Sequence, residues 1–291
     1  MDVLIQQITT QALNGLVLGM ILVLVASGLN LIFGIMDIVN FAHGEFYMAG
    51  AFLAWVTLNY VDSFWIALLV AALAVGVMGM AVDFFVLRAI RGREAIYSLM
   101  AMFGMSVLMQ QCALYIFGPL AKEIKAPISA KIPLFAFEYP VYRLSVVGIS
   151  ALIMFLVWLF LQRTKYGTWV RATMQDSVMA TVMGIPVKKV YTLTFALGTA
   201  MAAASGILVA PIFSVYTSMG MSIIVSAFIV VVIGGMGSIK GSIVAAILIG
   251  ELQTLSSVWI SPTYAKVFCF GILIVVLLFR PQGLFPITRK D

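Results

Sequence analysis

Long apolar stretches alternate with short polar connections along the chain. Nine of these stretches contain about 15 to 26 residues each, enough to cross a hydrocarbon core of roughly 30 Å, in some cases with a tilt. Backbone groups in lipid must be hydrogen-bonded within their own segment, so we expect helices. The pattern predicts an all-α integral membrane protein, a polytopic bundle of about nine transmembrane helices, or eight to ten because the second and last are short. The predicted helices cover residues 11–36, 46–61, 64–87, 95–117, 144–162, 191–216, 222–239, 241–260 and 264–279.

Composition supports a membrane location and a single transmembrane domain over residues 1–291. Hydrophobic residues make up 63% of the chain and charged residues 10%, whereas an average soluble domain carries about 25% charged residues. A soluble protein of this length could not bury so much apolar surface. The two cysteines, Cys112 and Cys269, lie inside apolar stretches, and we interpret them as small buried side chains rather than a disulfide or a metal site.

The positive charges indicate an orientation. The net charge of +6 comes from basic residues clustered between apolar stretches, which is typical of cytoplasmic loops and not of a nucleic-acid-binding surface. We therefore expect the N-terminus outside, the C-terminus in the cytoplasm, an external loop at residues 118–143 and a cytoplasmic loop at residues 163–190. This topology leaves five basic residues outside (Lys122, Lys125, Lys131, Arg143 and Lys266) and 12 inside, namely Arg88, Arg91, Arg93, Arg163, Lys165, Arg171, Lys188, Lys189, Lys240, Arg280, Arg289 and Lys290.

Polar residues gather between the first two apolar stretches. Asp37, Asn40, His43 and Glu45 lie there without any Lys or Arg. Such a run is typical of an ordinary cytoplasmic turn, and also of a broken helix at the inner end of a transport pathway, where polar groups at membrane depth face a cavity or a partner. His43 is the only histidine, so a zinc enzyme is not expected.

The basic loop 163–190 contains an amphipathic segment. Thr168 is a predicted helix start, and Gly184 followed by a proline is a predicted end. Val170, Met174 and Val178 follow each other at intervals of four residues, which predicts one apolar face on a helix over residues 168–183. Such a helix either lies on the lipid surface or binds in a groove of a partner protein.

A third informative segment is rich in glycine. Residues 234–242 read GGMGSIKGS, which resembles a phosphate-binding loop only superficially, because the lysine precedes the glycine and no strand comes before it. We interpret Gly234, Gly235, Gly237 and Gly241 as a structural turn with close helix packing.

Two acidic residues lie within apolar stretches. Asp83 is about one helical turn from Arg88, which predicts a structural role near the inner interface. Glu251 has no cation nearby in sequence, so it is a candidate for a residue of the pathway.

Small residues recur every four positions in two stretches. Gly198, Ala202 and Gly206 form one such series, and Gly15 and Gly19 form another. Small side chains at this spacing allow helices to approach closely in lipid.

Taken together, these segments resemble the branched-chain amino-acid permease family of ABC importers, in particular its LivH-type subunit, over nearly the whole chain. The resemblance is carried by GLNLIFG at 28–34, IVNFAHGEFYM at 38–48, the glycine turn, and RPQGLF at 280–285. In the basic loop, Arg171, Ala172, Asp176 and Gly184 resemble the family's coupling loop, although Arg171-Ala172 stands where ABC importers in general often have Glu-Ala-Ala.

The resemblance implies a permease without enzymatic activity in the bacterial inner membrane. Its expected partners are a second homologous permease, two ATP-binding subunits and a periplasmic substrate-binding protein. No cofactor is expected on this chain, since ATP and Mg would bind to the partner ATPases. Coupling to the ATPases would involve Arg171, Ala172, Met174, Asp176, Val178 and Gly184, and the candidate pathway residues are Asn40, His43, Glu45 and Glu251.

Other functions remain open at this point. Relatives that transport urea, short amides or other amino acids would share these motifs. An ion-coupled secondary transporter could use Glu251 or Glu45 as a proton site, and an intramembrane enzyme could use His43 with Glu45. Neither of these last two classes needs the amphipathic basic loop.

Overall fold

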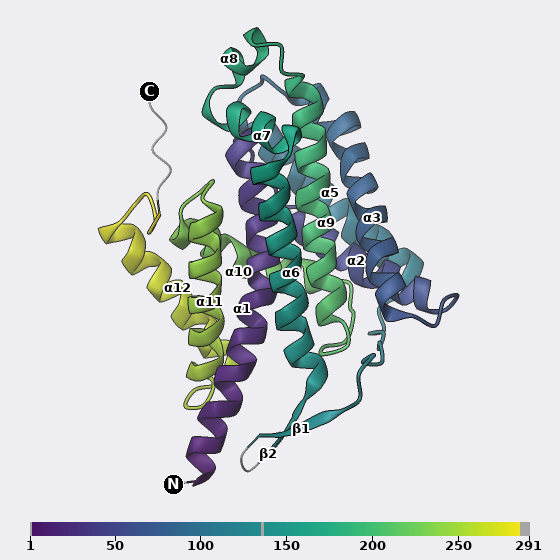
Figure 1. Cartoon of the computed structure of the whole chain (residues 1–291), viewed down its shortest axis with the longest axis vertical. Coiled ribbons are helices and arrows are strands. Elements are labelled where there is room, and N and C mark those ends of the chain that lie inside the picture. Colours follow the sequence, from purple (N-terminus) through teal and green to yellow (C-terminus); the bar gives the residue numbers. More distant parts are fainter. Residues whose placement is uncertain (1, 135–136, 286–291) are drawn as a thin grey trace.

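The computed structural model describes residues 2–134 and 137–285, and most of this part of the chain is helical (Figure 1). A π-helical segment, Asp83–Leu87, directly continues the third helix, and two short strands form an antiparallel hairpin. The elements are α1 (Asp2–Met36), α2 (His43–Leu58), α3 (Phe64–Val82), α4 (Arg88–Ile90), α5 (Ala95–Phe117), β1 (Lys131–Leu134), β2 (Phe137–Pro140), α6 (Val141–Arg163), α7 (Lys165–Gln175), α8 (Ser177–Val182), α9 (Val187–Val209), α10 (Met219–Gly234), α11 (Ile239–Ser256) and α12 (Pro262–Phe279).

Each of the nine predicted stretches overlaps a helix. Six helical segments of the described chain are long and apolar enough to cross a membrane: Leu4–Met36, Phe64–Ile90, Ala95–Phe117, Val141–Arg163, Val187–Val209 and Ile239–Ser256. The other three helices, α2, α10 and α12, contain 16, 16 and 18 residues. The chain is therefore a polytopic helical membrane protein.

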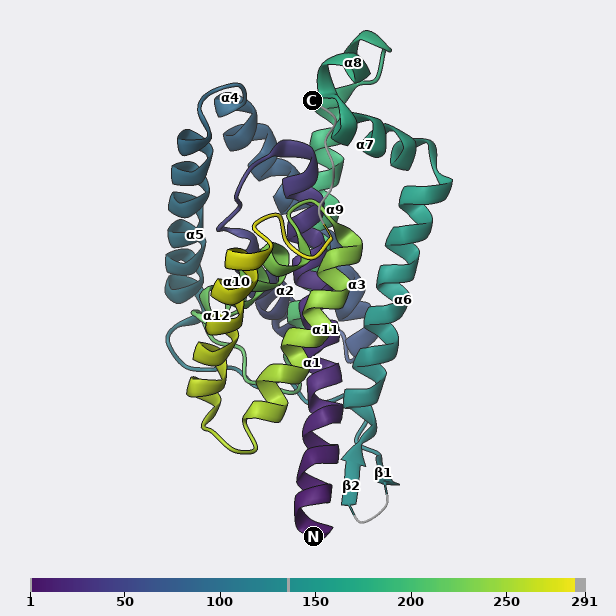
Figure 2. The same ribbon diagram turned by 90° about the vertical axis from the view of Figure 1, so that its left-hand side faces the viewer.

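The central helix of the bundle is α1. In its most apolar stretch 83% of the residues are buried, against 17% in α5. Both views show α1 running through the bundle, and Figure 2 shows α5 and α6 at opposite edges. The N-terminus of α1 and the pair α7–α8 lie at opposite ends of the molecule.

Glycines bring α1 into direct contact with two later helices, as their spacing predicts. A Cβ on Gly19 would lie 3.0 Å from the Cα of Ile247 in α11. A Cβ on Gly28 would lie 2.6 Å from the carbonyl oxygen of Gly198 in α9. Because these neighbours are backbone atoms, a larger side chain would force the helices apart.

The chain turns back into the bundle after α1. Residues 37–40 have no regular structure, and α2 begins at His43 beside the middle of α1, because the ring Nε2 of His43 lies 3.0 Å from the carbonyl oxygen of Val25. Val25 lies 11 residues before the end of α1 at Met36, or about 16 Å along the helix axis. The start of α2 is therefore deep in the bundle.

The carboxylate of Asp83, at the start of the π-helical segment after α3, pairs with Arg91 and is hydrogen-bonded to α9. Asp83 is fully buried and accepts hydrogen bonds from Nη2 of Arg91 at 2.5 Å and from Oγ1 of Thr192 at 2.6 Å. Arg88, the predicted neighbour, instead stacks over the ring of Phe84 at 4.4 Å. The π-helical segment and the turn after α4 change the register, so Arg91 rather than Arg88 reaches the carboxylate.

The loop between α5 and α6 contains the hairpin, which the sequence did not predict. Tyr139 on β2 is buried, and its hydroxyl donates a hydrogen bond to Oδ1 of Asn14 in α1 at 3.1 Å. Arg143, in the first turn of α6, donates to the same oxygen at 2.5 Å. Tyr142, in the first turn of α6, is buried and its hydroxyl donates a hydrogen bond to the carbonyl oxygen of Leu208 in α9 at 2.8 Å.

Candidate functional site

One side chain of α1 holds the glycine-rich turn between α10 and α11. Asn30 is fully buried, and its Nδ2 lies 3.1 Å from the carbonyl oxygen of Gly235 and 2.9 Å from that of Ser238. Its Oδ1 accepts a hydrogen bond from the backbone N–H of Gly237 at 2.5 Å. Gly235 and Gly237 have φ values of 104° and 86°, which glycine adopts without a Cβ clash. The turn is therefore fixed against α1.

The C-terminal segment packs on the same turn. The backbone N–H of Leu284 donates to the carbonyl oxygen of Ile233 at 2.8 Å, and that of Phe285 donates to Gly234 at 3.1 Å. A Cβ on Gly234 would lie 2.5 Å from the carbonyl carbon of Gly241, so α10 and α11 also meet here backbone to backbone.

The predicted helix over residues 168–183 is wrong in its extent, because the structure has two helices there. Thr164, not Thr168, caps α7, since its Oγ1 accepts a hydrogen bond from the N–H of Gly167 at 3.0 Å. Asp176 has extended backbone angles between α7 and α8, and its Oδ1 accepts from the N–H groups of Val178 and Met179 at 2.8 and 2.9 Å. A carboxylate in this position favours a new helix start over continuation of the old one.

The break at Asp176 divides the predicted apolar face. Val170 is buried and Met174 is half-buried, with its methyl group close to Gly34 of α1, so α7 packs on its own bundle. Arg171 also serves this packing, because its Nη1 donates to the carbonyl oxygen of Leu161 at the end of α6. Ala172 is half-buried.

By contrast, α8 presents apolar side chains outward. Its exposed apolar residues are Val178, Met179 and Val182, joined by Met183 after the helix; Val178 is 73% exposed. Gly184, with a φ of 80°, follows them and leads back to α9. In both views α8 projects beyond the ends of the neighbouring helices. The apolar surface of these four residues is called the α8 face below.

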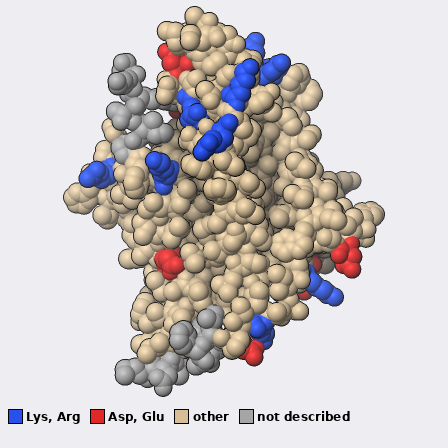
Figure 3. Space-filling model, viewed as in Figure 1, with Lys and Arg blue, Asp and Glu red and all other residues tan. Residues whose placement is uncertain are grey.

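Basic side chains surround this end of the molecule. Figure 3 shows Lys and Arg gathered near α7 and α8 on the viewed face, with fewer at the opposite end. The sequence from the end of α6 to the start of α9 supplies Arg163, Lys165, Arg171, Lys188 and Lys189.

A second group of polar residues lies where α2 begins. Asn40, His43 and Glu45 are all buried, with relative exposures of 0%, 0% and 1%. Neither side-chain atom of Asn40 has a hydrogen-bond partner among the described residues, nor does Nδ1 of His43. The predicted candidates therefore lie together at the same helix start, inside the bundle rather than in an exposed turn.

The carboxylate of Glu45 lies between three helices. Its Oε1 accepts a hydrogen bond from Oγ of Ser106 in α5 at 3.2 Å, while Oε2 is buried without a partner in the described chain. A Cβ on Gly220, in the first turn of α10, would lie 2.6 Å from Oε2. A Cβ on Gly44, in the first turn of α2, would in turn clash with the carbonyl oxygen of Gly220, so the starts of α2 and α10 meet at this carboxylate. We call Glu45, Ser106, Gly44 and Gly220 the Glu45 site.

The elements that form the Glu45 site also carry a cluster of aromatic rings. Phe41 precedes α2, and its ring centroid lies 5.1 Å from that of Phe228 in α10 and 6.3 Å from that of Phe103 in α5. Phe103 and Ser106 are three residues apart, so they point from the same face of α5.

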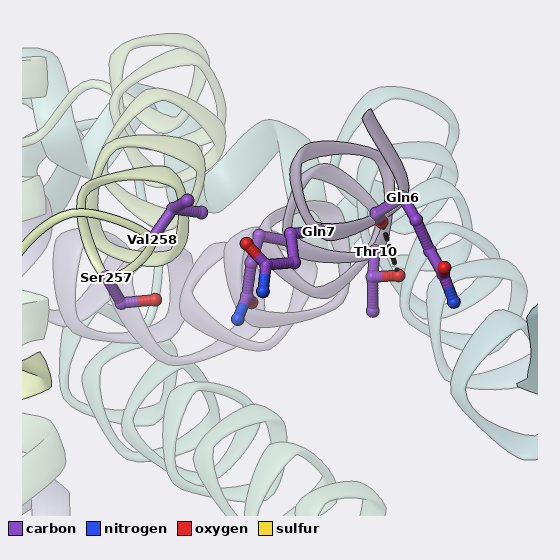
Figure 4. A pocket seen from close by; sticks show the side chains of 6 residues that line it. Gln6, Gln7, Thr10, Ser257 and Val258 are labelled. Carbon is purple, nitrogen blue, oxygen red and sulfur yellow. Dashed lines mark hydrogen bonds between the residues drawn. The ribbon is translucent and has the colours of Figure 1, made fainter. Parts of the chain in front are cut away.

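Glu251 lies apart from these residues. It is half-buried in α11, and one of its carboxylate oxygens would be 2.6 Å from a Cβ on Gly15. Gly15 lies ten residues before Val25, the level of His43, which is about 15 Å along α1. A cavity of about 390 Å³ opens near this end of the helices, lined by Gln6, Gln7, Thr10, Gln11, Ser257 and Val258 (Figure 4).

Several site residues were missed by sequence reasoning. Ser106 stands in an apolar helix and has no local signal that connects it with Glu45. Asn30 is a polar residue in an otherwise apolar stretch, which is a signal that could have been used. Within residues 2–134 and 137–285, no group of three or more His, Cys, Asp or Glu side chains is arranged to hold a metal ion.

Comparison with known proteins shows the family. Residues 11–277 match the family model described as "Branched-chain amino acid transport system / permease component". The chain belongs to this family. It is 30% identical to the high-affinity branched-chain amino acid transport system permease protein LivH of Escherichia coli (strain K12), and 28% identical to BraD of Pseudomonas aeruginosa, over 94% of each chain in both cases. It is also 26% identical to the permease protein LivM of Escherichia coli (strain K12), over 94% of this chain and 70% of LivM.

Apart from residues 38–48, which enter the bundle at α2, the segments that carry the family resemblance meet at one end of the molecule. Asn30 from the first segment binds the glycine turn, the C-terminal segment binds the other side of that turn, and Met174 of α7 contacts Gly34. In this permease the end of α1, the glycine turn and the C-terminal segment therefore pack together near α7 and α8.

Proposed function

We propose that this chain is the membrane-spanning permease subunit of an ATP-driven importer for branched-chain amino acids. The observation that carries the proposal is the match to relatives named for this transport, which extends over 94% of the chain. In this function the chain forms half of the translocation pathway and binds no nucleotide, since ATP and Mg bind to two partner ATPases. Its other partners are a second permease similar to LivM and a periplasmic substrate-binding protein.

The proposed topology has nine transmembrane helices with the N-terminus outside the cell and the C-terminus in the cytoplasm of a bacterium. It is supported by the position of α7 and α8 opposite the N-terminus and by the basic residues around them. Cysteines introduced at positions 165 and 188 should react with a membrane-impermeant reagent only from the cytoplasmic side, and a cysteine at 125 only from outside. Reaction of 125 and 188 from the same side would contradict this topology.

In this proposal the α8 face binds the ATPase. An apolar helix surface in a cytoplasmic loop is stabilised when a groove of a partner covers it. ATP binding and hydrolysis would move α8, and α7 would transmit the movement to the end of α1. The pathway then opens alternately to each side, because the nucleotide states of the ATPases favour different permease conformations.

The test of this contact is Val178→Asp. A charge buried in the interface without a partner should weaken binding by several kcal/mol, so the ATPases should no longer co-purify and substrate-stimulated ATP hydrolysis should be lost. Thr168→Asp is the matched control, because it adds the same charge at an exposed position of α7. Retention of the ATPases by both Val178→Asp and Met179→Asp would show that α8 is not the docking element.

The substrate and the energy source can be tested together. Proteoliposomes with the complete complex and its binding protein should import leucine, isoleucine or valine only with internal ATP. Preference of the binding protein for urea, short amides or another amino acid would change the substrate and keep the transport mechanism. Uptake driven by a proton gradient without ATP would instead indicate an ion-coupled transporter.

A further inference from the structure

We propose that the carboxylate of Glu45 binds the α-ammonium group of the transported amino acid at the meeting point of α2, α5 and α10. This inference rests on the proposed import of branched-chain amino acids and specifies where the permease contacts them.

The first argument is electrostatic. Among the described residues only two carboxylates are buried, those of Asp83 and Glu45. Asp83 has an arginine partner, whereas no described cation pairs with Glu45. A carboxylate in the interior of a membrane protein is costly without a cation or a full set of hydrogen bonds. Binding of an ammonium group would supply the missing charge.

The second argument is the free hydrogen-bonding capacity of the site. Within the described residues Oε2 of Glu45 has no hydrogen-bond partner, and it packs against Gly220 in the first turn of α10, where a Cβ would lie only 2.6 Å from it. In the described part of the chain no side chain caps the start of α2 or of α10. The positive ends of two helices thus meet beside this carboxylate. They reduce the energetic cost of the charge but leave Oε2 without a hydrogen bond.

The third argument concerns the rest of the ligand. A branched-chain amino acid carries its ammonium group next to a compact hydrocarbon side chain. The elements around the Glu45 site supply both parts, because Phe41, directly before α2, contacts the rings of Phe228 in α10 and Phe103 in α5, the same three elements that meet at the carboxylate. Phe103 and Ser106 come from α5, the least buried of the membrane-crossing helices that the structure describes.

Access to the site requires movement, since Glu45 is 1% exposed here. α5 contributes both the hydroxyl that binds Glu45 and Phe103 of the aromatic cluster, so displacement of α5 would open both contacts together. We therefore assign this arrangement to the closed site of the transport cycle.

The experiment is a binding measurement on the complete permease–ATPase complex in nanodiscs, without the binding protein. The probes are radiolabelled leucine with two competitors: 3-methylbutylamine, which keeps the ammonium group, and 4-methylpentanoate, which keeps the carboxylate. The amine should compete with leucine and the acid should not. Glu45→Gln should weaken leucine binding roughly 10- to 100-fold, the range expected for a hydrogen bond between charged groups, and should abolish competition by the amine.

Control variants keep the test decisive. Glu94→Gln removes an exposed carboxylate at the start of α5 and should leave binding unchanged. Glu45→Asp keeps the charge and should retain competition by the amine, even if Glu45→Gln assembles poorly. Unchanged leucine affinity in Glu45→Gln, or loss of competition by the amine in a well-assembled Glu45→Asp complex, would overturn the inference.

The uptake assay separates this result from the proposed function. ATP-dependent leucine import by the wild-type complex, together with unchanged affinity in Glu45→Gln, would overturn the inference and leave the function standing. Absence of leucine import by the wild-type complex would overturn the function on which the inference rests. Proton-driven uptake that Glu45→Gln abolishes would overturn both and make Glu45 a proton site.

Discussion

The two buried carboxylates of this permease differ in how completely they are paired. Asp83 accepts hydrogen bonds on both oxygens, from Arg91 at 2.5 Å and from Thr192 at 2.6 Å. Glu45 accepts one hydrogen bond, from Ser106 at 3.2 Å, and its other oxygen has no partner in the described chain. Both side chains are almost completely buried, so burial alone does not distinguish them.

The difference indicates two uses of a buried charge. Asp83 joins α3 to the start of α9 with groups of the same chain, which is a structural use. At the point where three helices meet, one carboxylate oxygen of Glu45 lacks a hydrogen-bond partner in the described chain. Such an unpaired group is expected where a ligand or a conformational change supplies the partner. Removal of a partner should therefore destabilise the Asp83 site, whereas removal of the charge itself should be tolerated at the Glu45 site.

The largest effect on stability is expected for Arg91→Ala. It leaves the carboxylate of Asp83 buried without a cation, which should lower the free energy of unfolding by about 3 kcal/mol or more. Thermal unfolding of the purified permease in detergent measures this loss. Arg88→Ala is the control, because Arg88 stacks on Phe84 and donates a long hydrogen bond, 3.5 Å, to the hydroxyl of Thr192, but forms no ion pair with Asp83 among the described residues. Equal loss in both variants would mean that the pairing of Asp83 is not what stabilises this end of α3.

A smaller effect is expected for Thr192→Val. The substitution keeps the shape of the side chain but removes the O–H donor to Asp83, so unfolding should become easier by about 2 kcal/mol. Thr194→Val on the same helix is a matched control, because the Thr194 hydroxyl is buried without a partner in the described structure. Its replacement should be neutral or stabilising. A greater loss of stability in Thr194→Val than in Thr192→Val would contradict a stabilising role for the hydrogen bond from Thr192 to Asp83.

The smallest effect on stability is expected for Glu45→Gln. The substitution removes an unpaired buried charge, so the free energy of unfolding should stay within about 1 kcal/mol of wild type or rise. Transport should nevertheless fall, as the ammonium-binding role requires. Unfolding measurements with uptake measurements on the same preparation check both parts, and a loss of several kcal/mol would place Glu45 with Asp83 as a structural residue.

The sequence predicts the positions of the helices well, because each is a continuous apolar stretch. It also predicts the close contacts of Gly19 and Gly198, since small residues at helical spacing have few other uses in lipid. Both are local signals that a single segment carries.

The partners of the buried polar groups could not be predicted, because they depend on distant parts of the chain. Asp83 pairs with Arg91 only after the π-helical segment has changed the register. Ser106 reaches Glu45 across 61 residues. The break at Asp176 is local, but the same residue also fits the interior of a helix, so spacing alone favoured one helix where the structure has two. The role of Asn40, His43 and Glu45 in the pathway stays a prediction.

The central position of α1 has a consequence for how the chain is made. α1 is synthesised first, but the surfaces that cover it belong to α9 and α11, and α11 begins about 200 residues after α1 ends. At 5 to 20 residues per second, roughly 10 to 40 s pass before α11 leaves the ribosome. During that time the amide of Asn30 lacks the turn that later binds it, and the glycine faces of α1 contact lipid or the insertion machinery. In ribosome-arrested chains that end before Gly241, a photo-crosslinker at Gly19 should therefore react with lipid or the insertion machinery and not with α11, however long the ribosome waits.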